Sequence, residues 1–119
     1  MPPNSSILHG VLNLSEDVFA YDFNLACSGF VYGLSMAHGL IYGGIAKNIL
    51  LVNADTYSKY INKKDRSTKV LFGDAASVSY LRQSNNKKGI IGFNLFVKLL
   101  FIFIIIIVIF NRNVINLTT

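Results

Sequence analysis

The only cysteine of the chain, Cys27, lies in the stretch DFNLACSGFVYGL, where the pattern of apolar residues changes. Before it, Phe19, Tyr21, Phe23 and Leu25 recur at every second position, which is typical of a strand. After it, apolar residues recur at intervals of three and four, which indicates a helix. The N-terminus of a helix offers unpaired N–H groups and a positive dipole end, which favour a thiolate and could stabilise an oxyanion. Cys27 is therefore a candidate nucleophile.

Spacing alone also permits a plainer interpretation of Cys27, as a small buried residue without chemistry. A single cysteine excludes an internal disulfide and a cysteine-based zinc site. The first ten residues, MPPNSSILHG, lack the basic start and apolar core of a signal peptide, so a cytoplasmic, reducing location is expected.

The positive charge is concentrated in one segment. The net charge is +5, and five of the eleven Lys and Arg residues are Lys59, Lys63, Lys64, Arg66 and Lys69. This segment is either a solvated loop or a site for a phosphate-bearing partner. Nucleic acid is not an expected partner, because the usual basic-helix, zinc and aromatic stacking motifs are absent from the sequence.

The composition is unusual for a chain of 119 residues, because 52% of it is hydrophobic and only 14% is charged. About 25% charged residues is usual, and a small domain needs more polar surface than a large one. The composition is therefore that of a segment from the interior of a larger protein, or that of a membrane-associated protein.

The elements expected to position Cys27 form an α/β pattern. A strand is predicted over 18–26, and a helix from the cysteine to Gly43-Gly44. The core-facing residues of that helix are predicted to be Phe30, Val31, Leu34, Ala37, Leu40 and Ile41. Its many glycines predict close packing of other backbones against it. A buried strand is predicted at 49–52, then the basic loop, a turn at Gly73-Asp74 and another strand.

Three further local predictions follow from turn and cap signals. A short helix near the N-terminus would be capped by Ser5 or Ser6. The stretch SNNKKG would be a hairpin-type connection, and GIIGFNLF would resume as a strand. The order of strands and helices predicts an α/β protein.

Two stretches, DFNLACSGFVYGLSMAHGLI and AKNILLVNADTYSKYINKKDRSTKVLFGDAASVSYL, resemble β-ketoacyl-acyl carrier protein synthase III, a condensing enzyme of the thiolase superfamily. The signatures ACSGF and DR-S-T…LFGD occur in the family's order, and the resemblance runs from about Pro2 to about Asn94. It implies a partial thiolase-like fold, a fragment of one αβα half with a buried helix after the cysteine strand. Residues 1–94 would form a partial N-terminal domain.

The resemblance implies an acyltransferase of fatty acid biosynthesis. Cys27 would accept an acyl group from acyl-CoA, and malonyl-acyl carrier protein would then decarboxylate and attack the thioester. Arg66 matches the family arginine near the CoA nucleotide, whereas Phe72, Gly73 and Asp74 match a mainly structural motif. The family uses no cofactor besides its acyl-CoA substrate, and it forms homodimers.

The family mechanism also uses a His and an Asn from the second half of the enzyme. His9 and His38 match neither position, and His38 lies about 16 Å beyond Cys27 along the predicted helix. A family segment before PPNSS is also expected to be missing. We therefore expect an internal fragment of the first half that can be acylated but cannot condense, and that is inactive as a synthase by itself.

The tail, residues 95–119, differs from the rest of the chain because Leu99 to Phe110 is an unbroken apolar run. It is a membrane anchor, a buried strand or helix, or out-of-frame translation. We favour the third interpretation, because the tail is built from residues of A/T-rich codons and its run is short for the hydrocarbon core. The alternative function is a small non-enzymatic protein that contacts a membrane through 95–110.

Overall fold

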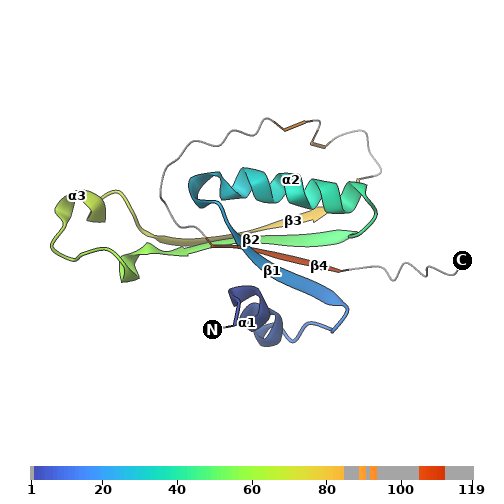
Figure 1. The fold of residues 1–119 in the computed structure, drawn as a ribbon, viewed down its shortest axis with the longest axis horizontal. Helices are drawn as coiled ribbons and strands as arrows, with labels where there is room; N and C mark the ends of the chain where they lie inside the picture. Colours follow the sequence, from blue (N-terminus) through green and yellow to red (C-terminus); the bar gives the residue numbers. More distant parts are fainter. Residues whose placement is uncertain (1, 85–88, 91, 94–104, 112–119) are drawn as a thin grey trace, which may run out of the picture.

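The computed structural model describes residues 2–84, 89–90, 92–93 and 105–111. It contains a four-stranded sheet in the order β1-β4-β2-β3, in which all neighbouring strands are antiparallel (Figure 1). The elements are α1 (Asn4–Val11), β1 (Val18–Asn24), η1 (Ala26–Ser28), α2 (Gly29–Tyr42), β2 (Asn48–Thr56), η2 (Tyr57–Lys59), α3 (Arg66–Lys69), β3 (Asp74–Arg82) and β4 (Ile105–Asn111).

The unit β1–α2–β2 is a strand–helix–strand crossover. Because β4 is antiparallel to both β1 and β2, these two strands run parallel to each other with β4 between them. The α2 helix lies along one face of the sheet, and α1 lies near β1 (Figure 1). This arrangement confirms the predicted α/β class and is consistent with part of a thiolase-like half.

The main core lies between α2 and the sheet. Ala37, Ile49 and Leu51 are fully buried there, and Leu34, Leu40 and Ile41 pack around them as predicted. Phe30 and Val31, however, are 44% and 43% exposed, so their predicted burial is wrong. The helix meets the sheet through its small residues instead: Gly29, Gly33 and Ala37 are its buried positions. At about 100° per residue, Val31 points away from that face, whereas Phe30 is exposed at the N-terminal end of the helix.

The opposite face of the sheet carries a second cluster around Val52, with Leu8 of α1 and Leu50 of β2 among its members. The predicted serine cap of α1 is wrong. Pro3 occupies the N-cap without a side-chain bond, and Ser5 lies inside the helix, fully buried. The N–H groups of Asn4 and Ser5, in the first turn of the helix, donate to the Asp22 carboxylate of β1 instead.

The predicted strands are found with changed bounds. The strand before the cysteine ends at Asn24 rather than at residue 26, because the backbone turns there. β2 extends beyond the predicted 49–52 in both directions, and β3 starts at Asp74, which was predicted to belong to the preceding turn. The predicted strand from Gly89 is not found in its described part, since residues 89–90 and 92–93 belong to no strand. Most of the predicted hairpin connection, 85–88, lies outside the described residues.

Residues 105–111 of the tail form β4. Residues 95–104 and 112–119 lie outside the described residues, so the interpretation of the tail as out-of-frame or as an anchor stays a prediction. Within the described ranges, no helix combines the length and apolar character needed to cross a bilayer.

Candidate active site

Cys27 lies on a sharp turn between β1 and α2. Leu25 leaves the strand conformation with φ −138° and ψ 30°, and Ala26 adopts a left-handed φ of 48°. A left-handed L-residue costs about 1–2 kcal/mol, so this turn is held in place by its surroundings. The cysteine follows within the single turn η1, and its side chain is exposed.

Local hydrogen bonds hold this turn. The Ala26 N–H donates to Oδ1 of Asn24 at 3.2 Å. The Ser28 hydroxyl donates to the Leu25 carbonyl oxygen at 2.8 Å, and the Ser28 N–H donates to the same oxygen at 3.3 Å. These bonds place Cys27 at the C-terminal end of β1 and directly before the first turn of α2.

The N-terminus of α2 has no side-chain cap in the described part of the chain. Ser28 at the N-cap makes no capping bond, and the first turn carries no acidic residue. The Gly29 N–H donates to the Ala26 carbonyl oxygen, and the positive end of the helix dipole favours a negative charge at this position. The predicted placement of the cysteine where a strand turns into a helix is therefore present.

Close packing fixes α2 on the sheet. A Cβ built at Gly33 would lie 2.8 Å from Cδ1 of Leu51 and 3.0 Å from Cζ of Phe23. A side chain there would force Leu51 and Phe23 to shift, so α2 lies close to the sheet at Gly33, but the contact with another backbone that the glycines predicted is not found at this position. The contacts at Gly33 are made by side chains of β1 and β2 rather than by backbone.

Arg66, the second predicted site residue, begins the short helix α3. The Asp65 carboxylate caps this helix, because Oδ1 accepts from the N–H groups of Ser67 and Thr68 at 3.0 and 3.2 Å. It also accepts the hydroxyls of both residues at 2.6 Å. Ser67, followed by Thr68, contributes most to lowering the pKa of the Asp65 carboxyl from 3.8 to about 2. The DRST motif is thus a self-capped turn that leaves Arg66 exposed.

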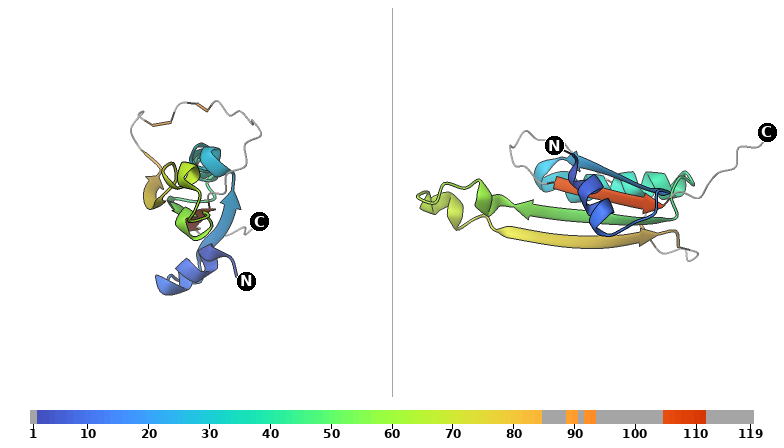
Figure 2. Two further views of the ribbon diagram at one scale, coloured as in Figure 1. Left: turned by 90° about the vertical axis from the view of Figure 1, so that its left-hand side faces the viewer. Right: turned by 90° about the horizontal axis from the view of Figure 1, so that it is seen from below.

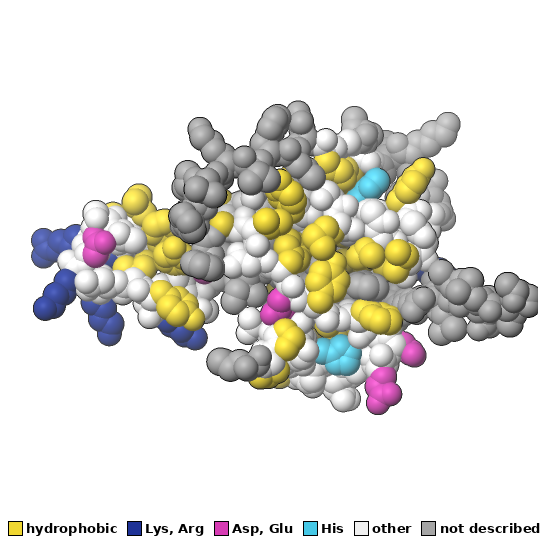
Figure 3. All heavy atoms as spheres, viewed as in Figure 1, with side chains coloured by type: hydrophobic (Ala, Val, Ile, Leu, Met, Phe, Trp, Pro, Cys, Tyr) yellow, Lys and Arg dark blue, Asp and Glu magenta, His cyan; other side chains and the backbone are white. Residues whose placement is uncertain are grey.

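The segment 57–73, here called the arm, carries α3 away from the sheet (Figure 1). Two contacts close its base: the rings of Tyr57 and Phe72 stack at 4.6 Å, and Ser58 donates to Asp74. The Ser58 hydroxyl and N–H, together with the charge of Lys59, lower the pKa of the Asp74 carboxyl. Lys and Arg side chains gather at this end of the molecule (Figure 3).

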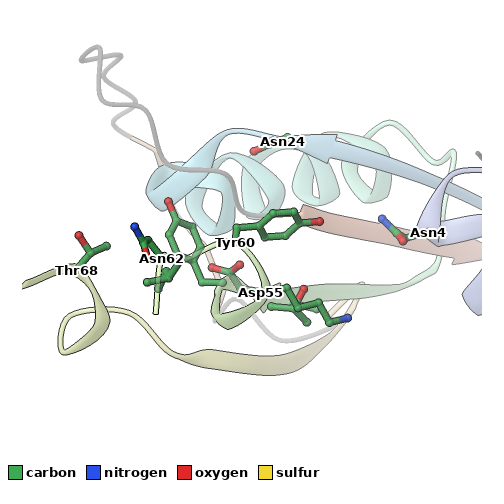
Figure 4. A pocket seen from close by; sticks show the side chains of 11 residues that line it. Asn4, Asn24, Asp55, Tyr60, Asn62 and Thr68 are labelled. Carbon is green, nitrogen blue, oxygen red and sulfur yellow. The ribbon is translucent and has the colours of Figure 1, made fainter. Parts of the chain in front are cut away.

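A hollow of about 950 Å³ lies between the end of β1 and the arm. Asn24 lines it from β1, Asp55 from β2, and Tyr60, Asn62 and Thr68 from the arm (Figure 4). Cys27 and Arg66 do not line it, but Asn24 is three residues before the cysteine and Thr68 is two residues after the arginine. The structure therefore does not join the two predicted site residues directly, but places the hollow between their segments.

Four residues that line the hollow are not predictable as site residues from the sequence pattern: Asn24, Tyr57, Tyr60 and Asn62. Two tyrosines within the basic segment TYSKYINKKDR were the available signal, because aromatic rings beside cations are common in binding sites. Their gathering around one hollow depends on the path of the arm, which no spacing rule specifies.

Neither histidine lies beside the cysteine in sequence or makes a contact with it. His38 stacks on Tyr42 at 5.8 Å and meets Phe93 edge-on at 5.6 Å, toward the far end of α2. Nε2 of His9 lies 3.1 Å from the carbonyl oxygen of Ser15. Among the described residues, no three His, Cys, Asp or Glu side chains form a group that could hold a metal ion.

Comparison with known sequences identifies the family of the chain. The sequence model of 3-oxoacyl-[acyl-carrier-protein] synthase III matches residues 21–98, which include both the cysteine turn and the arm. The chain belongs to this synthase III family. The predicted resemblance is therefore confirmed.

Relatives in the family come from several bacteria. The chain is 42% identical to β-ketoacyl-[acyl-carrier-protein] synthase III of Rickettsia prowazekii over 95 residues, 80% of this chain and 30% of that protein. It is 44% identical to the Coxiella burnetii (strain CbuK_Q154) synthase III over 90 residues, 76% of this chain and 28% of that protein. The chain thus spans about 30% of the length of these synthase III relatives. No solved structure matches significantly.

Proposed function

We propose that this chain carries the acyl-accepting cysteine of a β-ketoacyl-acyl carrier protein synthase III, an acyltransferase of fatty acid biosynthesis. One observation carries the proposal: Cys27 is exposed on a strained turn in front of an uncapped helix N-terminus. This turn lies within the residues that match the synthase III family.

The chemical step is a thioester exchange. The Cys27 thiolate attacks the carbonyl carbon of acyl-CoA, and backbone N–H groups at the start of α2 stabilise the oxyanion. The new bond joins Sγ to the acyl carbon, the bond to the CoA sulfur breaks, and CoA leaves as a thiolate that takes up a proton. No redox change occurs, so the step needs no cofactor.

Arg66 is proposed to contact the nucleotide of CoA. It is exposed on α3, and Lys59 at the base of the arm adds positive charge near the hollow. A guanidinium binds phosphate oxygens in a bidentate manner, which suits the nucleotide end of CoA. The hollow between the cysteine turn and the arm would then provide room for the rest of the thioester.

The second half-reaction is decarboxylation of malonyl-acyl carrier protein and attack of its carbanion on the thioester. Family members need hydrogen-bond donors from His and Asn for this step. The two histidines of this chain are held in other contacts, and His38 is eleven residues along α2 from Cys27. We therefore propose that the chain accepts an acyl group but does not condense it.

Intact-mass spectrometry after incubation with acetyl-CoA tests the acylation. We expect one acetyl group on the folded chain, located at Cys27 by peptide mapping and absent from Cys27→Ser. The urea-unfolded chain is the control, because it keeps the thiol but loses the turn. Equal acylation of folded and unfolded chain, or none, would contradict the proposal.

Addition of malonyl-acyl carrier protein to the acetylated chain tests the second claim. We expect the acetyl group to remain on Cys27 and no β-ketoacyl product to form. Formation of that product would show that the chain is a complete synthase, and would leave the acylation claim intact.

The alternative function in a membrane gains no support, because the relatives reported above carry the enzyme's name. A homodimer of the family type, membrane contact through 95–110, a cytoplasmic location and the division between 1–94 and 95–119 stay predictions.

A further inference from the structure

The tail segment 105–111, which the proposed function does not use, is a central strand of the sheet. All seven residues of β4 pair with β1 on one side and with β2 on the other. Figure 2 shows β4 in red between β1 in blue and β2 in green. Among the described residues β1 pairs with no other strand, so β4 is the strand that joins the cysteine strand to the rest of the sheet.

The slot that β4 fills is built from one continuous unit, β1–α2–β2. The helix α2 connects the two strands and packs on both, because Gly33 approaches Phe23 of β1 and Leu51 of β2. The strands run parallel and face each other across the width of one strand. Without a strand in the slot, the N–H and C=O groups along both of these edges would have no strand partner.

The sequence of β4 suits this position. It reads IIIVIFN, so six of its seven residues are apolar. A strand with neighbours on both sides and helices over both faces reads as a continuous apolar run. Such cover is present, since α2 contacts β4 from one face of the sheet and α1 contacts it from the other. The apolar run of the tail therefore has the pattern of a buried strand.

The last pair of this ladder lies beside the cysteine turn. Ile105 of β4 pairs with Asn24, and the side chain of Asn24 accepts the hydrogen bond from the Ala26 N–H within the turn. Ala26 has a left-handed φ of 48°, and a strained residue keeps such a conformation only where the surrounding structure holds it. The strand end on which the turn is built is thus held in the sheet by β4.

We propose that the tail strand β4 is a positioning element of the acyl-accepting site. It completes the sheet between β1 and β2, and thereby holds the turn that presents Cys27. The unit able to accept an acyl group then extends through residue 111 and is not confined to 1–94. The effect on acylation rests on the proposed function, whereas the effect on β1 does not.

Ile107→Pro in the full chain tests this role, because proline removes a ladder N–H from the middle of β4. We expect acetylation of Cys27 by acetyl-CoA to slow at least about tenfold, since a small displacement of a reacting group is costly. Amide hydrogen exchange should accelerate more in β1 than in the β2–β3 ladder. Ile107→Val keeps the N–H and should behave as the unaltered chain.

The matched control is Ile115→Pro, the same exchange four residues beyond the end of β4. It should leave both the acetylation rate and the exchange of β1 unchanged. Equal rates in all of these proteins, or equal losses in the two proline variants, would overturn the proposal.

Hydrogen exchange of the unaltered chain keeps the proposal falsifiable if Ile107→Pro fails to fold. A strand between two antiparallel neighbours donates each N–H to one or the other, so amides 106–110 should be protected as well as those of β2. Fast exchange at 106–110 beside a protected β2–β3 ladder would overturn the inference. Protection of β4 and β1 without any acetylation of Cys27 would instead contradict the proposed acyl transfer, and would still support the placement of β1 by β4.

Discussion

The carboxylate of Asp22 in β1 caps the first helix, because Oδ1 accepts a hydrogen bond from the Ser5 N–H at 2.7 Å. The other oxygen accepts from the Asn4 N–H, also at 2.7 Å. A tertiary contact therefore replaces the local serine cap that the sequence predicts. The strand that leads to Cys27 and the helix α1 are joined through this one side chain.

Replacement of Asp22 by alanine should lower the free energy of unfolding by about 1 kcal/mol, because it leaves two helix N–H groups without an acceptor. Asp22→Asn keeps an acceptor oxygen and should cost less. Urea denaturation followed by circular dichroism measures both. Asp17→Ala, at an exposed acidic residue in the preceding turn, is the control and should have little effect. Equal losses for Asp22→Ala and Asp17→Ala would refute the capping role.

Two glycines of α2 should respond in opposite ways to alanine. Nothing lies within 4 Å of a Cβ at Gly39, so Gly39→Ala should raise the free energy of unfolding by about 0.5–1 kcal/mol. At Gly33 the new methyl group would overlap buried Leu51, so the same exchange should bring no such gain. Gly33→Val should destabilise the protein by about 1–3 kcal/mol. Thermal or urea unfolding measures this series, and stabilisation by Gly33→Ala equal to that at Gly39 would contradict the close approach.

The nucleotide contact proposed for Arg66 should affect only substrates that carry the nucleotide. Arg66→Ala should reduce the rate of Cys27 acylation by acetyl-CoA roughly tenfold at low substrate concentration, since a charge-assisted contact is lost. Acylation by acetyl-pantetheine, which lacks the nucleotide, should be unchanged. Lys64→Ala removes a neighbouring exposed cation of the arm and should have a smaller effect. A loss that is the same for both thioesters would assign Arg66 a structural role.

The capped turn of α3 should depend on pH only in strongly acidic solution. The folded pKa of Asp65 is lowered from 3.8 to about 2, so its contribution is complete above pH 4 and is lost as the pH falls through 2. NMR titration of the Asp65 carboxyl carbon and of the Ser67 and Thr68 amides measures this midpoint. In Asp65→Asn the side chain does not titrate, so those amide signals should lose the transition. A midpoint near 4 for the wild-type carboxyl would show that the hydrogen bonds do not persist in solution.

The sequence by itself determined the features that depend on short-range patterns. The alternation of Phe19, Tyr21 and Phe23 predicted β1, and the period of three to four predicted α2 up to its glycine stop. The ACSGF and LFGD signatures predicted the family that the comparisons then showed. These features are readable because backbone periodicity and turn chemistry act over a few residues.

Only the tertiary structure decided which residues meet across long separations. Asp22 caps α1, Gly33 lies against Leu51, and the hollow gathers residues from β1, β2 and the arm, none of which follows from spacing. The bulky side chains of Phe30 and Val31 were assigned to the core by their period, but the close contact belongs to the small residues of α2. The physical reason is that the side chains of the sheet decide which face of a helix can approach it most closely. The hydrophobic pattern of the helix alone does not specify that face.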